Sequence, residues 1–123
     1  MIVAEHKNFN MSIIQEKKHV HIQVIGFLKG PAVEAYVAAL QETISKVDRP
    51  SFKLIVDASQ QSPLPASVAN KTYGDTLNFY LTFGFKEVCI VMPKSKIGYV
   101  QLRNTAEEIQ YKGTLVDHIT DIK

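Results

Sequence analysis

The sequence has very little cysteine and no long apolar run. Its single thiol, Cys89, cannot form an internal disulfide, which predicts a reducing compartment and therefore a cytoplasmic location. The apolar runs, such as residues 88–92, fall far short of the roughly 20 residues that span a bilayer. The first residues also lack the basic-then-apolar pattern of a signal peptide. We therefore expect no membrane span and no secretion.

A strong charge of one sign is missing as well. Fourteen Lys and Arg stand against twelve Asp and Glu, a formal net charge of +2, and the cations are scattered from Lys7 to Lys123. Without a basic cluster, a nucleic-acid partner is not expected. What the sequence does have is 123 residues, of which 46% are hydrophobic and 21% charged. These values are typical of one folded domain, here spanning residues 1–123.

Apolar periodicity predicts eight secondary-structure elements. The first two are strands over 10–16 and 19–24, joined by a hairpin turn, because apolar and polar residues alternate in the second segment and Lys17-Lys18 interrupt the pattern. The other predicted elements are helices over 31–47, 66–82 and 97–112, strands over 54–57, 88–92 and 115–119, and a loop over 59–65.

The alternation of strands and helices predicts an α/β domain with a mixed sheet of about five strands. Crossover helices are expected mainly on one face of that sheet, with an antiparallel hairpin at its start. Two of the strands, 54–57 and 88–92, are unbroken apolar runs with a helical crossover between them. We expect these two strands to be adjacent, parallel and buried on both faces.

Two segments carry a resemblance to a known family. Residues 21–28, His-Ile-Gln-Val-Ile-Gly-Phe-Leu, look like a second strand with its glycine before the first helix. Residues 54–59, Leu-Ile-Val-Asp-Ala-Ser, look like a central strand that ends in Asp-x-Ser. Together with the order of elements, they resemble the STAS domain of anti-sigma factor antagonists, the SpoIIAA-like family. The resemblance covers about residues 10–120 and implies a SpoIIAA-like fold.

The same resemblance implies a non-catalytic regulatory or protein-interaction module. The implied partner is a protein, such as a kinase or a sigma-factor regulator, or a second copy of the chain. In the antagonists a serine at the start of the second helix is phosphorylated, and Ser67 falls at that position. Pro65 stands in place of an aspartate of the family motif, and no glycine follows the serine. This departure argues against a phosphorylation switch and leaves the fold untouched.

Three serines lie in or next to the predicted loop. Ser59, Ser62 and Ser67 form a candidate phosphorylation or anion site, because a helix start that follows a central strand can hold an anion. For Ser67 the alternative is a simple N-cap of the second helix. Pro63 and Pro65 remove two N–H donors from the loop.

Phe79 and Phe83 lie four residues apart in the second predicted helix and form an apolar stripe beside the one that packs on the sheet. Either the third helix or the chain end covers this stripe, or it is an interaction surface for a partner, a second copy or an apolar ligand. The last option gives the alternative function, which is binding of a lipid or another apolar small molecule.

No catalytic, metal or cofactor site is predicted. His19 and His21 share one strand face that we expect to be solvated, and no third metal ligand is near them in the sequence. Ser59, Asp57 and a histidine lack the Gly-x-Ser-x-Gly elbow of a nucleophilic triad. Cys89 lies in an apolar run, so we expect a buried thiol with a raised pKa. No glycine-rich phosphate loop follows a strand, so neither an enzyme nor a nucleotide cofactor is expected.

Overall fold

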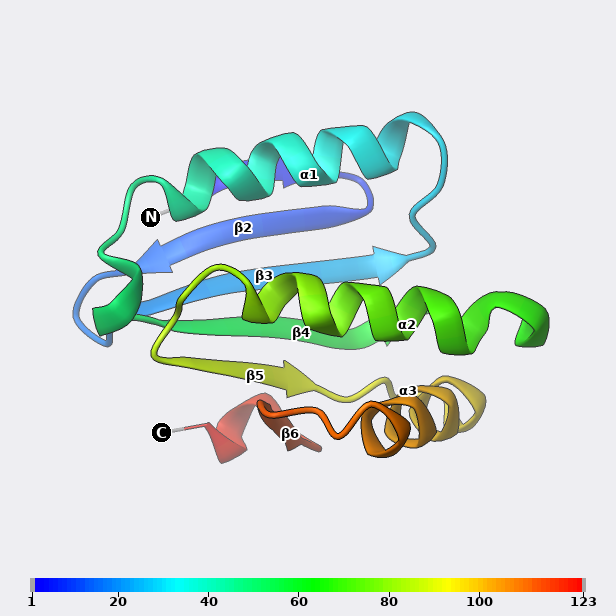
Figure 1. Cartoon of the computed structure of the whole chain (residues 1–123). Helices are drawn as coiled ribbons and strands as arrows, with labels where there is room; N and C mark the ends of the chain where they lie inside the picture. The colour runs from blue at the N-terminus through cyan, green and yellow to red at the C-terminus, as the bar shows by residue number, and fades with distance from the viewer. Residues whose placement is uncertain (1, 123) are drawn as a thin grey trace.

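Six strands lie side by side in the order in which the chain makes them (Figure 1). The computed structural model describes residues 2–122. Its strands are β1 (Ile2–His6), β2 (Phe9–Ile14), β3 (His19–Gly26), β4 (Lys53–Gln61), β5 (Glu87–Val91) and β6 (Thr114–Val116). Its helices are α1 (Pro31–Ile44), α2 (Ala66–Leu81) and α3 (Lys96–Glu108), with two short 3-10 turns, η1 (Arg49–Ser51) and η2 (Ile119–Asp121).

The sheet is mixed, as the sequence predicts. Strands β1, β2 and β3 pair antiparallel, and each later strand pairs parallel with the one before it. The predicted hairpin turn is confirmed: Lys18 adopts the left-handed conformation, with φ 56°, and its N–H donates to the carbonyl of Gln15 at 3.1 Å. Parallel pairs need crossovers, and α1, α2 and α3 supply them.

All three helices pack on the same face of the sheet. The main core contains Tyr36 from α1, Tyr73 from α2 and Leu102 from α3, together with the side chains that the strands send to that face. In Figure 1, α1 lies in front of the N-terminal hairpin and α2 in front of the middle strands. We call the opposite side of the sheet the outer face. The prediction of helices mainly on one face is confirmed.

The two interior strands that the apolar runs predict are adjacent and parallel. Leu54 pairs with Val88, and Ile55 pairs with Cys89. The core side receives Leu54 and Val88, whereas Ile55 and Cys89 point to the outer face and are still only 1% and 2% exposed. The prediction that both strands are buried on both faces is therefore confirmed.

One strand was not predicted. β1 forms the sheet edge beside β2, with an irregular register between Ile2 and Ala4. Its sequence, Ile-Val-Ala-Glu-His, has no regular alternation of apolar and polar residues that would predict a strand. An edge strand can form without such a pattern, because it does not have to bury one whole face in the core. The sheet therefore has six strands, and the prediction of about five is one short.

The predicted loop 59–65 is also partly wrong, because β4 continues to Gln61. A register irregularity in the pairing of β3 with β4 accompanies this extension, after which Ile25 pairs with Gln60 and Gly26 with Gln61. The polar sequence Ser-Gln-Gln has no apolar pattern that would predict a strand. This part of β4 is a strand because it pairs with the neighbouring strand. Ser59 consequently lies in a strand and not in a loop.

Three other predicted boundaries shift. α1 ends at Ile44 and not at residue 47, and β6 covers only Thr114–Val116 before the η2 turn replaces the rest of the predicted strand. α3 begins at Lys96 after the N-cap Ser95 and ends at Glu108. Gln110 adopts φ 54° and stops α3 before the predicted end at residue 112.

Candidate functional site

The three candidate serines lie where β4 ends and α2 begins. Ser59 is in β4, where its N–H donates to the Asp57 carboxylate at 2.9 Å. Ser62 is exposed and its N–H donates to the Gly26 carbonyl at 2.8 Å. Ser67 is exposed in the first turn of α2, but the N-cap residue is Pro65, and no side chain caps this helix. The expected role of Ser67 as N-cap is therefore wrong, because the helix begins one residue before it.

The segment before α2 is pinned to α3. The side chain of Gln101 accepts from the Leu64 N–H at 3.1 Å and donates to the Leu64 carbonyl at 2.8 Å. Pro63 and Pro65 have no N–H group, and the Ser62 N–H donates to Gly26. Few backbone N–H groups of this segment therefore remain available to bind an anion. The phosphorylation or anion site at these serines stays a prediction, and the geometry favours another site.

That other site is a cavity of about 220 Å³ between α1, α2 and the sheet. The strands contribute its floor through Val24, Val56 and Ile90, while Phe27 and Leu64 lie in the segments that border it. Both helices send aromatic side chains into its walls. The complete lining is Val24, Phe27, Leu28, Val33, Tyr36, Val37, Val56, Ala58, Gln61, Leu64, Thr72, Tyr73, Thr76, Leu77, Phe79, Tyr80, Ile90 and Leu102.

The residues that line the cavity include three tyrosines, two threonines and one glutamine, all with polar side-chain groups. Tyr36 on α1 and Tyr80 on α2 are hydrogen-bonded to each other through their hydroxyl groups. The hydroxyl of Tyr73 is buried and has no hydrogen-bond partner within residues 2–122. Burial raises the pKa of Tyr80 to about 12 and also raises the pKa of Tyr36 and of Tyr73. All three groups therefore stay protonated near neutral pH, and Tyr73 presents an unused O–H donor.

Phe79 and Phe83 contact each other edge to face, with ring centroids 4.8 Å apart. Both are half-buried and pack against the main core, and Phe79 lines the cavity. Together, the two side chains therefore do not form a broadly exposed stripe. Their role as an interaction surface stays a prediction, and the position of Phe79 connects this pair to the apolar-ligand alternative.

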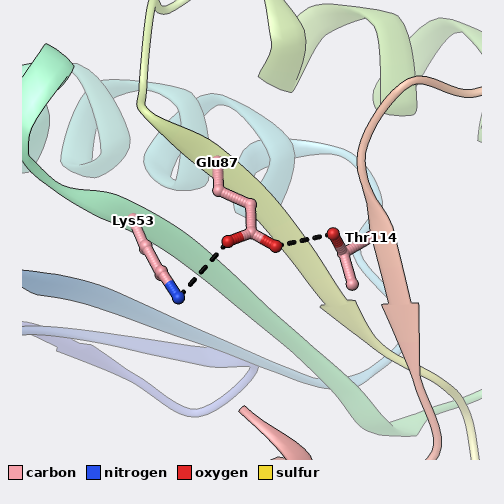
Figure 2. A network of polar contacts seen from close by, with 3 residues as sticks. All are labelled: Lys53, Glu87 and Thr114. Carbon is pink, nitrogen blue, oxygen red and sulfur yellow. Dashed lines mark hydrogen bonds and ion pairs between the residues drawn. The ribbon is translucent and has the colours of Figure 1, made fainter. Parts of the chain in front are cut away.

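The outer face of the sheet carries a network of three polar side chains. Glu87 on β5 lies 3.3 Å from the Lys53 ammonium on β4, and the Thr114 hydroxyl on β6 donates to its other oxygen at 2.6 Å. Figure 2 shows the Glu87 carboxylate between these two partners. The hydrogen bond from Thr114 is the main cause that lowers the pKa of Glu87. This network ties three parallel strands together and keeps the carboxylate charged.

On the outer face, His19 and Cys89 are buried and His21 is half-buried. His19 and His21 lie with ring centroids 5.8 Å apart, and His19 is only 5% exposed, so the expectation of a solvated face is wrong at His19. Here β3 is interior to the sheet, between β2 and β4. Burial, with the neighbouring His19 and then Lys17, lowers the pKa of His21. Burial, followed by Glu87, raises the pKa of Cys89 to about 11, as expected.

Among residues 2–122, no group of three or more His, Cys, Asp or Glu side chains could hold a metal ion. No helix among these residues has the length and apolarity to cross a bilayer.

The sequence-based predictions missed the tyrosines of the cavity. Tyr36, Tyr73 and Tyr80 are counted there as apolar residues of two helix stripes, yet each carries a hydroxyl that must find a partner once buried. Three phenols on the inward stripes of two helices are the signal that could have found the site. Their convergence could not be predicted without knowing that α1 and α2 lie next to each other.

The arrangement defines a class of fold: a mixed sheet with strands in chain order and three crossover helices on one face. No protein-family profile and no curated protein matches the sequence. Among solved structures, the chain is similar to the crystal structure of an uncharacterized DUF3478 family protein with a SpoIIAA-like fold from Shewanella loihica PV-4. The two share 16% sequence identity, the match covers 96% of this chain and 93% of that chain, and the TM-score is 0.60.

This likeness establishes the fold of the chain and nothing finer. The chain has a SpoIIAA-like fold, as the STAS resemblance in residues 21–28 and 54–59 predicts. At 16% identity, activity and partners do not transfer from one protein to the other.

Proposed function

We propose that the chain is a non-catalytic binding domain that holds an apolar small molecule in the cavity between α1 and α2. The observation that carries the proposal is a cavity of about 220 Å³ lined mainly by aliphatic and aromatic side chains. Protein interiors are close-packed, and a void of this size lowers stability unless something fills it.

Size and lining agree with this role. An apolar cavity of about 150 Å³ is large enough to hold benzene, and the present cavity is larger. Its walls are mostly aliphatic and aromatic, with a few polar groups, which is the usual composition of small-molecule sites. The half-buried Phe79 belongs to the wall, which links the lipid-binding alternative to a defined space.

A benzene titration followed by methyl NMR tests the proposal. Benzene should shift the methyl resonances of Val56, Leu77 and Ile90, which line the cavity. The variant Thr76→Phe places a ring in the cavity wall and should weaken benzene binding at least tenfold. Asn78→Phe adds the same ring at an exposed position of α2 and should leave binding unchanged. Benzene that leaves the three sets of methyl resonances unmoved would contradict the proposal.

A second candidate function is the regulatory module that the STAS resemblance implies. Its partner would be a kinase, a sigma-factor regulator or a second copy of the chain. It is favoured by exposed apolar side chains near the start of α2 and α3, where Val68 is 46%, Ile97 64% and Val100 37% exposed. Since α2 and α3 pack against each other, these residues provide apolar contact area near one end of the helix pair. With its lone buried thiol Cys89, the module would act in the cytoplasm.

The double change Ile97→Ser with Val100→Ser tests this second function. Both side chains are exposed, so thermal stability should change little, whereas a dimer detected by analytical ultracentrifugation, or a purified kinase complex, should dissociate. The matched change Ile119→Ser, at another exposed position, should leave the complex intact. A complex that survives the double change would place the interface elsewhere.

A further inference from the structure

The cavity between α1, α2 and the sheet opens where both helices begin, and the inference drawn from this opening rests on the proposed binding function. Along α1 the lining goes from Val33, which is 42% exposed, to Val37, which is half-buried. Along α2 it goes from Thr72, which is exposed, to Thr76, which is half-buried. The third exposed lining residue is Phe27, 38% exposed, in the connection from β3 to α1. We call the part of the cavity beside Phe27, Val33 and Thr72 the mouth.

The mouth lies at the carboxyl ends of two parallel strands. β3 and β4 are parallel neighbours, and the connections from their ends lead into α1 and α2 (Figure 1). Ligands of open α/β sheets usually bind at this end. Tyr36 and Tyr80 are buried in the wall, and their hydrogen-bonded hydroxyls join α1 to α2 there. This arrangement favours entry between the starts of the two helices.

The polar residues of the lining, apart from the tyrosines, belong to its more exposed part. Gln61 and Thr76 are half-buried and Thr72 is exposed, whereas Val56 and Ile90 on the sheet are only 4% and 2% exposed. Within residues 2–122, no Asp, Glu, Lys, Arg or His lines the cavity. A charge drawn inside would lose its hydration and gain no counter-charge, which is a large penalty. At the mouth the same charge keeps its water.

We infer that the cavity binds a compact amphiphile in one direction, with its apolar end toward Val56 and Ile90 and its polar or charged end in the mouth. The volume of about 220 Å³ exceeds the cavity of about 150 Å³ that accepts benzene, so it suits a ring with a short chain. A charged end is tolerated only when the chain is long enough to carry it to the mouth.

Two pairs of probes test this dependence on chain length. Benzoate is compared with benzyl alcohol, and 5-phenylpentanoate with 5-phenylpentan-1-ol, so each pair differs in charge and not in the number of carbon atoms. Benzoate should bind at least about 100-fold more weakly than benzyl alcohol, because its charge would lie beside the ring inside the cavity. The longer carboxylate should bind within about threefold of its alcohol, because its charge stays hydrated. Calorimetric titration or methyl NMR measures the affinities.

A charge introduced at the mouth tests where the polar end lies. Val33→Lys should raise the affinity for 5-phenylpentanoate relative to its alcohol about threefold, and Val33→Glu should lower it by a similar factor. Both changes fall on an exposed side chain, so the fold should persist. Ile119→Lys is the matched control, because Ile119 is 41% exposed in η2 and lies outside the cavity lining. It should leave the affinity ratio unchanged.

The outcomes separate this inference from the function on which it rests. A ratio of carboxylate to alcohol affinity that is the same for both chain lengths, or that does not respond to the charge at position 33, overturns the inference and leaves apolar binding intact. If neither alcohol binds, the proposed function itself fails.

Discussion

The hydroxyl groups of Tyr36 and Tyr80 are hydrogen-bonded to each other inside the core, although the residues lie on different helices, 44 positions apart in the sequence. Both rings are buried, at 6% and 3% exposure. Each hydroxyl therefore depends on the other for a hydrogen bond that water cannot supply. The pair joins α1 to α2 beside the cavity and holds the two helices in register.

This mutual dependence predicts non-additive mutations. Tyr36→Phe or Tyr80→Phe alone leaves one buried hydroxyl without its partner and should lower the free energy of unfolding by about 1–3 kcal/mol. The double variant removes both hydroxyls and should lose clearly less than the sum of the single losses. Urea unfolding of the four proteins measures the coupling. Strictly additive losses would show that the two hydroxyls do not depend on each other.

The polar network of the outer face predicts a pH-dependent effect. Hydrogen bonding from Thr114 lowers the folded-state pKa of Glu87, so the charged carboxylate contributes stability above its unfolded-state pKa. That contribution is lost as the pH falls through the folded-state pKa. Thr114→Val should lower the free energy of unfolding by about 1 kcal/mol near neutral pH, a value reduced because Glu87 is partly exposed.

At an acidic pH below the folded-state pKa of Glu87, the same substitution should have little effect, because the carboxylate is then protonated. Thr120→Val, at an exposed position in η2, is the control and should show no pH dependence. Denaturant unfolding at the two pH values checks both variants. An equal loss at both pH values would mean that Thr114 acts through packing and not through the Glu87 charge.

Cys89 should be an unreactive thiol in the folded chain. It is 2% exposed, and burial raises its pKa to about 11, so very little thiolate exists near pH 8. Alkylation by iodoacetamide should be at least about 100-fold slower than that of an unstructured cysteine peptide. In denaturant the rate should rise to the peptide value. Fast modification of the native protein would argue for frequent opening around β5.

Two helix starts predict opposite outcomes for the same substitution. Ser95 caps α3, where its hydroxyl accepts from the Gly98 N–H at 3.2 Å, so Ser95→Ala should cost about 1 kcal/mol. Ser67 is exposed and does not cap α2, so Ser67→Ala should change the free energy of unfolding by less than about 0.5 kcal/mol. Thermal and urea unfolding test the pair. A cost at Ser67 equal to that at Ser95 would restore its capping role.

The sequence predicts those parts of the fold that bury a continuous apolar pattern. The runs 54–57 and 88–92 become paired interior strands, because a segment buried on both faces has no other way to place its side chains. The polar end of β4 and the edge strand β1 were missed because their stability comes from neighbours. The apolar pattern of a segment does not predict stabilisation that comes from pairing with a neighbouring strand.

The candidate site was predictable only in part. The sequence indicates Phe79, which does line the cavity, but the wall also includes residues of β3, α1, β4, β5 and α3 and of two loops. The cavity depends on what α1, α2 and the sheet leave vacant between them. Spacing along one helix cannot reveal that gap, because its limits are set by residues distant in sequence.

The strand order has a consequence for how the chain is made. Each strand from β2 onward pairs with the strand that the ribosome has produced just before it. The N-terminal hairpin can therefore form first. Every later strand can then pair with a strand that is already in the sheet, and only one helix separates successive parallel strands in the sequence. Loop-closure entropy stays low at each step, since no strand waits for a partner that is synthesised much later. Growth of the sheet can thus keep pace with translation, one strand at a time.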